Sequence, residues 1–203
     1  MMTRRIIAAT GLALLFATSV AIAQTPSPSV RVRGTIEKVD GQTLMVKSRD
    51  GTEFTVKLAD NARITAMVKA SLADIKTGSF IGVTGMPQPD GSQKATAVII
   101  FPEAMRGLGD GHRPWDYVPS STMTNATVDT SVAGVDGEKL TVKYKDGEKT
   151  VLVTPTTEIA TYAKKSLADL KPGEKIFIAA AKKGPDGTLE APNVSFGDYA
   201  VWR

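Results

Sequence analysis

The sequence predicts a mainly all-β protein made of two tandem, small, five-stranded OB-like barrels, each with one short helix, joined by an ordered but irregular connector. Two observations carry this prediction. One sequence unit occurs twice along the chain, and within each copy apolar and polar residues alternate with a period of two. That period is typical of a strand that buries one face.

The internal repeat consists of three blocks that recur in the same order. VDGQTLMVKSRDG (39–51) returns as VDGEKLTVKYKDG, SLADIKTG (71–78) returns as SLADLKPG, and PDG (89–91) returns unchanged. The offsets between the copies are 96, 95 and 96 residues. Three ordered blocks at a nearly constant offset indicate a duplication.

Each copy has the pattern of strands joined by tight turns. Phe54, Val56 and Leu58 alternate with polar residues, and so do Leu44 and Val46. In the second copy, Leu140, Val142 and Tyr144 follow the same pattern. Asp-Gly pairs separate these runs and supply the positive φ angles of hairpin turns; they lie at 40–41, 50–51, 136–137 and 146–147.

One short helix is predicted in each copy. Ser71 is followed three residues later by Asp74, which completes a capping box, and Ser166 with Asp169 repeats the pattern. Glycines at 78 and 173 end the helices. Three strands, a short helix and two strands are the order of an OB-type barrel. An SH3-like barrel or another compact β-roll is the alternative.

The N-terminal segment predicts export. Arg4 and Arg5 precede an apolar run over 6–23 that ends in Ala21-Ile22-Ala23, the A-x-A cleavage pattern. We therefore expect cleavage after Ala23, a periplasmic protein, and no stable membrane span after cleavage; an uncleaved anchor is the alternative. The expected organisation is a signal peptide (1–23), a tether (24–29), barrel one (30–101), the connector (102–124) and barrel two (125–203).

Composition excludes several classes of function. The chain has no cysteine, which rules out disulfides, thiol nucleophiles and thiolate metal sites. Without Arg4 and Arg5, 25 − 2 = 23 basic residues face 21 acidic ones, a formal charge of +2. These charges are interspersed, whereas nucleic-acid binding favours a basic stripe. We expect no nucleic-acid partner.

Two segments resemble a known family. The repeated opening V-x-G-T-I-x-x-V-D-G-x-T-L-x-V-K, together with SLADIKTG, resembles the exported bacterial domain of unknown function 5666. The connector FPEAMRGLGDGHRPWD, followed by STMTNATV, resembles a subset often labelled automatically as a metal ABC transporter permease. A permease needs several spanning helices, so the residues do not support that label. The family has no established reaction, and the resemblance implies architecture only.

The connector is the segment that the repeat does not explain. It is rich in aromatic and bulky residues, so we expect an ordered strap and not a disordered linker. One hypothesis is a clamp in which Trp115 is buried between the barrels, while His112 and Asp116 bond backbone groups. The other is a groove for an anionic or sugar-like envelope ligand or a partner protein. Its expected ligand-binding residues are Trp115, Tyr117, Arg106, Arg113, His112 and Asp116.

A third hypothesis places a metal ion in the connector. Asp110, His112 and Asp116 offer oxygen and nitrogen ligands, and Met105 and Met123 offer thioethers suited to copper(I). No catalytic constellation is recognisable, so we expect no enzyme and no required cofactor, although a metal ion is possible. The prediction is an exported, non-enzymatic binding or scaffolding protein that uses the junction between the barrels. Its partner would be an envelope protein or a small envelope ligand, and periplasmic metal handling is the alternative.

Overall fold

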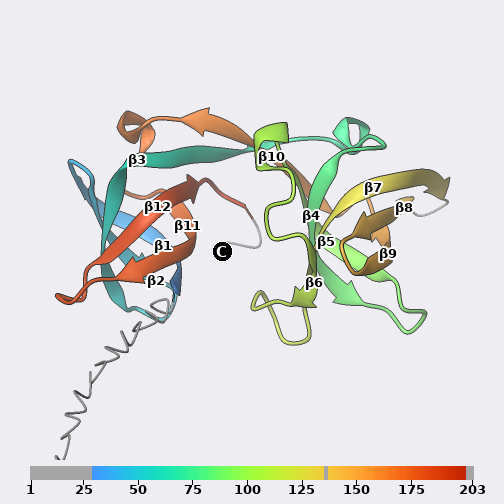
Figure 1. Ribbon diagram of the computed structural model, residues 1–203, viewed down its shortest axis with the longest axis horizontal. Coiled ribbons are helices and arrows are strands. Elements are labelled where there is room, and N and C mark those ends of the chain that lie inside the picture. Colours follow the sequence, from blue (N-terminus) through green and yellow to red (C-terminus); the bar gives the residue numbers. More distant parts are fainter. Residues whose placement is uncertain (1–28, 135–136, 200–203) are drawn as a thin grey trace, which may run out of the picture.

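The computed structural model describes residues 29–134 and 137–199 and confirms the all-β class (Figure 1). The first copy contains β1 (Ser29–Asp40), β2 (Thr43–Ser48), β3 (Glu53–Lys69), β4 (Phe80–Pro87) and β5 (Gln93–Ile100). The connector contains β6 (Gly111–Pro114). The second copy contains β7 (Thr122–Gly134), β8 (Gly137–Tyr144), β9 (Gly147–Val153), β10 (Glu158–Lys165), β11 (Lys175–Lys183) and β12 (Leu189–Phe196). Three short 3-10 helices complete the structure: η1 (Leu72–Asp74), η2 (Glu103–Met105) and η3 (Leu167–Asp169).

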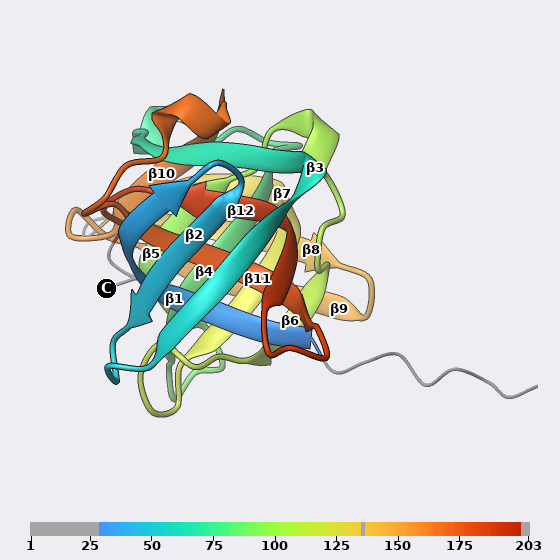
Figure 2. The same cartoon turned by 90° about the vertical axis from the view of Figure 1, so that its left-hand side faces the viewer.

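Strand pairing forms two closed five-stranded rings. Ring one consists of β1, β2, β3, β12 and β11 in that order around the barrel (Figure 2). Ring two consists of β7, β8, β9, β5 and β4. Neighbours are antiparallel except β3 with β12 and β5 with β9, which are parallel. Each ring therefore has the strand order that the OB-type prediction implies.

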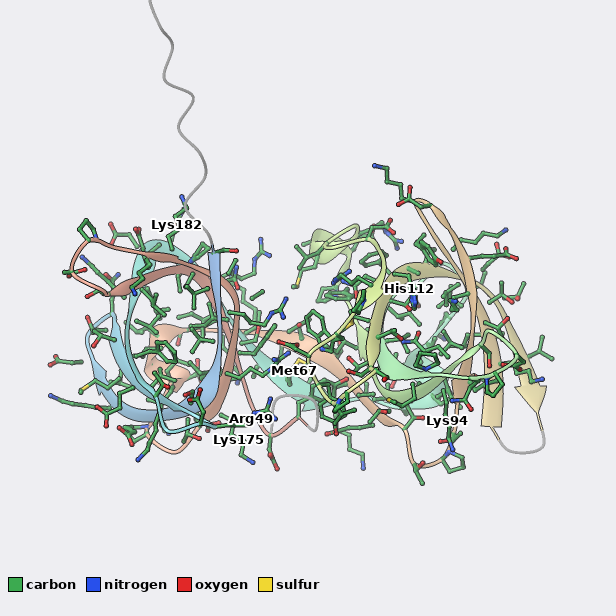
Figure 3. The ribbon with its side chains drawn as sticks, turned by 90° about the horizontal axis from the view of Figure 1, so that it is seen from below. Arg49, Met67, Lys94, His112, Lys175 and Lys182 are labelled. Atoms are coloured by element: carbon green, nitrogen blue, oxygen red, sulfur yellow. The ribbon has the colours of Figure 1, made fainter. Side chains whose placement is uncertain are left out.

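The two rings exchange their last two strands. β4 and β5 of the first copy close ring two, and β11 and β12 of the second copy close ring one. The predicted division into one barrel at 30–101 and another at 125–203 therefore does not match the strand pairing. The physical reason is that β3 continues past ring one to pair with β10, carrying the chain to the other ring. Met67 of β3 lies between the rings (Figure 3).

The alternating residues form the cores. Leu44, Val46, Val56 and Leu58 are buried in ring one, as their pattern predicts. Leu140 and Val142 are buried in ring two, while Tyr144 packs at its margin. Each fully buried side chain of this kind contributes about 1.5–3 kcal/mol. Hydrophobic burial therefore holds two separate ring cores.

The predicted helices and turns are present in short form. The carboxylate of Asp74 accepts hydrogen bonds from the backbone N–H and the hydroxyl of Ser71, and Asp169 does the same with Ser166. Each capping box holds only a three-residue 3-10 helix. Gly41 and Gly51 have φ of +55° and +85°, as the Asp-Gly turns require. Asp136 of the predicted 136–137 turn lies outside the described residues.

Candidate functional site

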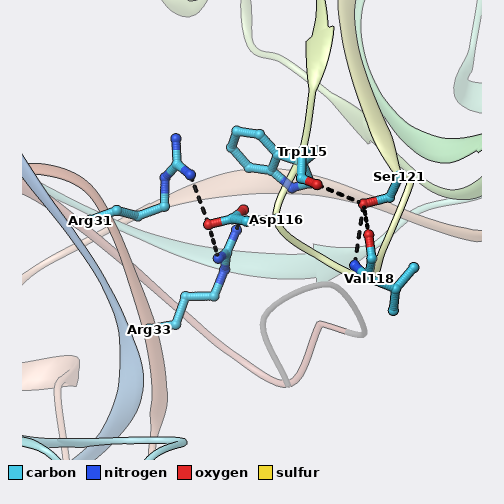
Figure 4. A network of polar contacts seen from close by, with 6 residues as sticks. All are labelled: Arg31, Arg33, Trp115, Asp116, Val118 and Ser121. Carbon is cyan, nitrogen blue, oxygen red and sulfur yellow. Dashed lines mark hydrogen bonds and ion pairs between the residues drawn. The ribbon is translucent and has the colours of Figure 1, made fainter.

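The connector is fixed to ring two and presents a loop to ring one. His112 and Arg113 of β6 pair with Thr124 and Met123 of β7. The loop from Trp115 to Ser121 is closed by the Trp115 N–H, which donates to the Ser121 carbonyl at 2.8 Å. The Ser121 hydroxyl is within bonding distance of the Val118 and Trp115 carbonyls, at 2.7 and 3.0 Å (Figure 4). These hydrogen bonds close the loop from Trp115 to Ser121 on itself.

Asp116 ties this loop to β1 of ring one. Its carboxylate accepts two hydrogen bonds from Arg33, both at 2.8 Å, and one from Arg31 at 2.9 Å (Figure 4). The Arg33 bonds and then the Arg31 bond hold the pKa of Asp116 well below its usual range. The Arg33 side chain is 9% exposed and that of Asp116 is 49% exposed. The ion pair thus bridges the connector and ring one.

Trp115 lies among three guanidinium groups. Its ring centroid is 4.3 Å from Cζ of Arg31, 5.4 Å from that of Arg33 and 5.6 Å from that of Arg113. Cations over an indole face are attracted by its negative π-surface. Burial and then Arg31 lower the pKa of Arg113. This crowding of positive charge makes the junction strongly favourable for an anion.

A cavity of about 330 Å³ lies at this junction and is lined by both rings and the connector. We call it the junction cavity. Its lining is mainly apolar but contains four arginines, and no Asp or Glu occurs among its described lining residues. Its arginines are Arg31, Arg33, Arg63 and Arg113, and its aromatic residues are Phe101, Trp115, Tyr162 and Phe177. The remaining lining residues include Thr65, Gly82, Ile99, Met105, Leu108, Met123, Asn125, Ala179, Ala180, Asn193 and Ser195.

Three buried polar atoms in this lining have no hydrogen-bond partner. They are Nε of Arg33, Nε1 of Trp115 and Oδ1 of Asn125, and they are the complete set within the described part of the chain. The amide orientation of Asn125 is fixed because its Nδ2 donates to the Leu108 carbonyl at 2.8 Å. Leaving such a group unpaired costs about 1–3 kcal/mol. The residues that carry these two donors and one acceptor line the same cavity, and because the three atoms themselves are covered in this conformation, a ligand reaches them only when their side chains move.

The structure brings some of the predicted ligand-binding residues together. Trp115 and Arg113 line the junction cavity, and Asp116 ion-pairs with two of its arginines. Tyr117 packs instead against the small core cluster that contains Tyr199. Arg106 is held by Glu103 and by the Gly78 carbonyl, and it does not line the cavity.

The predicted oxygen and nitrogen ligands of a metal, Asp110, His112 and Asp116, do not form one group, and the two predicted thioethers lie elsewhere, in the junction cavity. Nδ1 of His112 is 2.8 Å from the Thr124 hydroxyl, and its ring stacks on Tyr144. Asp110 accepts from the backbone N–H of Lys145 at 3.2 Å. Met105 and Met123 line the junction cavity. Among the residues that the structure describes, no group of three or more His, Cys, Asp or Glu could hold a metal ion.

Sequence reasoning missed Arg31, Arg33, Asn125 and Tyr162. A signal existed for the first two, because they flank the buried Val32 and must point away from the core of ring one. No local signal identifies Asn125, a 6% exposed residue in the middle of a strand. Its role depends on how the rings face each other.

Residues 33–98 match the family model described as Domain of unknown function (DUF5666). This match covers about a third of the chain and runs from β1 to β5, so it includes strands of both rings. The comparisons with curated proteins and with solved structures find no match. Within the described ranges, no helix is long and apolar enough to cross a membrane.

Proposed function

We propose that this is an exported, non-enzymatic binding protein whose ligand site is the junction cavity. The observation that carries the proposal is that three residues lining one mainly apolar cavity, Arg33, Trp115 and Asn125, each have a buried polar atom without a hydrogen-bond partner. Ligand sites commonly combine an apolar lining with a few polar groups that fix orientation. The position between two rings and a strap also suits a small molecule.

The chemistry of the lining favours binding over catalysis. Guanidinium, indole and amide groups do not change their protonation state near neutral pH, so they suit recognition and not acid–base catalysis. Tyr162 is the lining residue with an ionisable hydroxyl, and burial raises its pKa. The site is thus equipped to hold a ligand in place.

The cavity can be tested with N-phenyl-1-naphthylamine, a neutral dye that fluoresces in apolar surroundings. We expect one dye molecule to bind per chain. Ala179 is exposed and lines the cavity, so Ala179→Phe should fill the site without removing a bonded group. Ala133 is an exposed strand alanine in β7 that does not line the cavity, and Ala133→Phe is the matched control.

The expected result is loss of dye binding in Ala179→Phe and unchanged binding in Ala133→Phe, with both melting temperatures close to that of the wild type. Equal dye binding by both variants, or no binding by the wild type, contradicts a ligand site in this cavity. The export part of the proposal is tested separately by the intact mass of the protein from its native host. That mass should correspond to a chain beginning at Gln24.

A further inference from the structure

Arg33 and Asn125 occupy equivalent positions in the two rings. Arg33 lies opposite Phe177 in the β1–β11 ladder, and Asn125 lies opposite Gly82 in the β7–β4 ladder. Gly82 and Phe177 are 95 residues apart, the offset that relates SLADIKTG to SLADLKPG. Arg31 and Met123 lie two positions earlier on the same strands.

These equivalent positions have different chemistry. β1 of ring one contributes the arginines at 31 and 33 to the junction cavity, whereas β7 of ring two contributes the thioether of Met123 and the amide of Asn125. The unpartnered atom on the ring-one side is a donor, Arg33 Nε, and Trp115 Nε1 of the connector adds a second donor. The unpartnered atom on the ring-two side is an acceptor, Asn125 Oδ1. The unpartnered groups that the two sides bring to the cavity lining are therefore of opposite hydrogen-bonding type.

Aromatic residues also line the cavity. Phe101 and Tyr162 have ring centroids 5.7 Å apart, and Phe177 lies beneath the Arg33 guanidinium at 5.1 Å. All three line the cavity. Such rings pack well against a flat apolar body.

From this arrangement we propose that the ligand is a compact aromatic anion with a hydrogen-bond donor at its other end, such as a hydroxyaryl carboxylate. Once small side-chain movements uncover the three atoms, the carboxylate accepts from Arg33 Nε and Trp115 Nε1, and the hydroxyl donates to Asn125 Oδ1. This inference rests on the proposed function, because it names the ligand class of the same cavity.

Asp116 supports this assignment instead of competing with it. Its two oxygens bond both terminal nitrogens of Arg33, so the guanidinium is held in one orientation with its Nε free. Arg63 and Arg113 add further positive charge to the lining, so positive charges outnumber negative ones there even when the Asp116 carboxylate is counted. A second, ligand-borne anion is therefore accommodated.

Three matched naphthalenes test the inference by isothermal titration calorimetry at pH 7. The first is 6-hydroxy-2-naphthoate, which has both polar ends; 2-naphthoate lacks the donor, and 2-naphthol lacks the anion. We expect each incomplete analogue to bind at least ~10-fold more weakly, because it leaves buried groups of the protein unpaired. Equal affinities for all three compounds would overturn the inference.

Two arginine variants locate the anion. Arg33→Lys keeps the charge but removes Nε, and it should reduce the preference for 6-hydroxy-2-naphthoate over 2-naphthol. Arg106→Lys changes an arginine of the connector that does not line the cavity and should leave that preference unchanged. An unaltered preference in Arg33→Lys contradicts the assignment of the carboxylate to Arg33. If this variant folds poorly, the comparison of the three ligands on the wild type still tests the ligand class.

The two proposals can fail separately. If the neutral dye binds and Ala179→Phe blocks it, while the three naphthalenes show no selectivity, the cavity is a binding site but the ligand class is wrong. If neither the dye nor any naphthalene binds, the proposed function itself is wrong.

Discussion

Met67 and Tyr162 lie directly opposite each other in the β3–β10 ladder, and they occupy the same position in the two copies of the repeat. The offset of 95 residues that relates Ser71 to Ser166 also relates Met67 to Tyr162. An antiparallel ladder that pairs a position with its own counterpart has a local two-fold axis at that pair. The two copies of the repeat therefore meet as two subunits of a symmetric dimer do, within one chain.

The strand exchange follows from this symmetry. Each copy extends its third strand across the axis and delivers its last two strands to the other ring. The same exchange between separate chains is domain swapping. Here it makes each ring depend on both halves of the sequence, and it places Tyr162 of the crossing strand in the lining of the junction cavity.

The exchange predicts a specific cross-link. The hydroxyl oxygens of Thr65 in β3 and Ser195 in β12 are 2.8 Å apart. Because the chain has no cysteine of its own, a Thr65→Cys and Ser195→Cys double variant contains only these two thiols. We expect it to form an intramolecular disulfide on mild oxidation, measured by intact mass and by mobility on a non-reducing gel.

Ile99 supplies the matched control for this cross-link. It is the counterpart of Ser195 in the first copy, 96 residues earlier, and it would lie beside Thr65 if each copy closed its own barrel. In the structure it belongs to β5 and pairs with β4 and β10. Cross-linking of Thr65→Cys with Ile99→Cys, and not with Ser195→Cys, would show that the strands are not exchanged.

Replacing Asp116 by Asn should destabilise the protein. The change removes the one carboxylate that Arg31 and Arg33 share and leaves two neighbouring cations without it. Because Asp116 is half exposed, we expect a loss of about 1 kcal/mol in the free energy of unfolding at pH 7. Urea titration of both proteins measures this loss.

The effect of Asp116 should depend on pH. The pKa of Asp116 is lower in the folded protein than its unfolded value of about 3.9. The unfolded chain therefore binds more protons in acid, and the stability that Asp116 contributes is present above about pH 4 and is lost as the pH falls below it. The difference between the wild type and Asp116→Asn should shrink over that range, and a constant difference from pH 7 to pH 2.5 would contradict the ion-pair explanation.

Trp115 separates the clamp hypothesis from the binding hypothesis. Trp115→Ala should weaken binding of 6-hydroxy-2-naphthoate by at least ~10-fold, because it removes both a donor and an aromatic wall. We expect stability to fall by only about 1–2 kcal/mol, since the ring is half buried and its cation contacts are partly solvated. Trp115→Phe keeps an aromatic ring but lacks the N–H, so its affinity should lie between those of the wild type and Trp115→Ala. A large loss of stability with unchanged binding would instead identify Trp115 as a clamp.

Local features of this fold could be predicted from the sequence, whereas its long-range pairing could not. The inward positions of Leu44 and Val56 follow from strand period, and the turn at Gly41 follows from its Asp-Gly pair. The strand exchange between the rings cannot be predicted from the sequence, because Ile81 and Ile176 occupy the same position of the repeat. The strand that contains either residue could therefore pair with β1. The two copies present similar strand edges, and the choice between them depends on the crossing of β3 with β10.

The same limit applies to the candidate site. Trp115 could be singled out because an aromatic residue in a long, irregular segment is unusual. Arg33 and Asn125 converge only because the connector and both rings meet at one cavity. Their spacing of 92 residues along the chain carries no signal, since it differs from the offset of 95 or 96 in the recognisable blocks.

His112 provides a pH-dependent test of the connector's attachment to ring two. Burial, then Lys149 and Arg113, lower the pKa of His112, so the folded protein favours the neutral ring. The unfolded chain takes up the proton first, at a pKa of about 6.5, and stability should therefore decrease as the pH falls below that value. His112→Gln keeps a group that can bond Thr124 but does not titrate.

His112 is the only histidine, so this variant removes all imidazole titration from the chain. Urea titrations between pH 8 and pH 5 should show the wild type losing stability relative to His112→Gln as the pH falls. The sign of this change is decisive. A wild type that gains stability relative to the variant on acidification would mean that the protonated ring is favoured, contrary to the repulsion expected from the positive charges of Lys149 and Arg113.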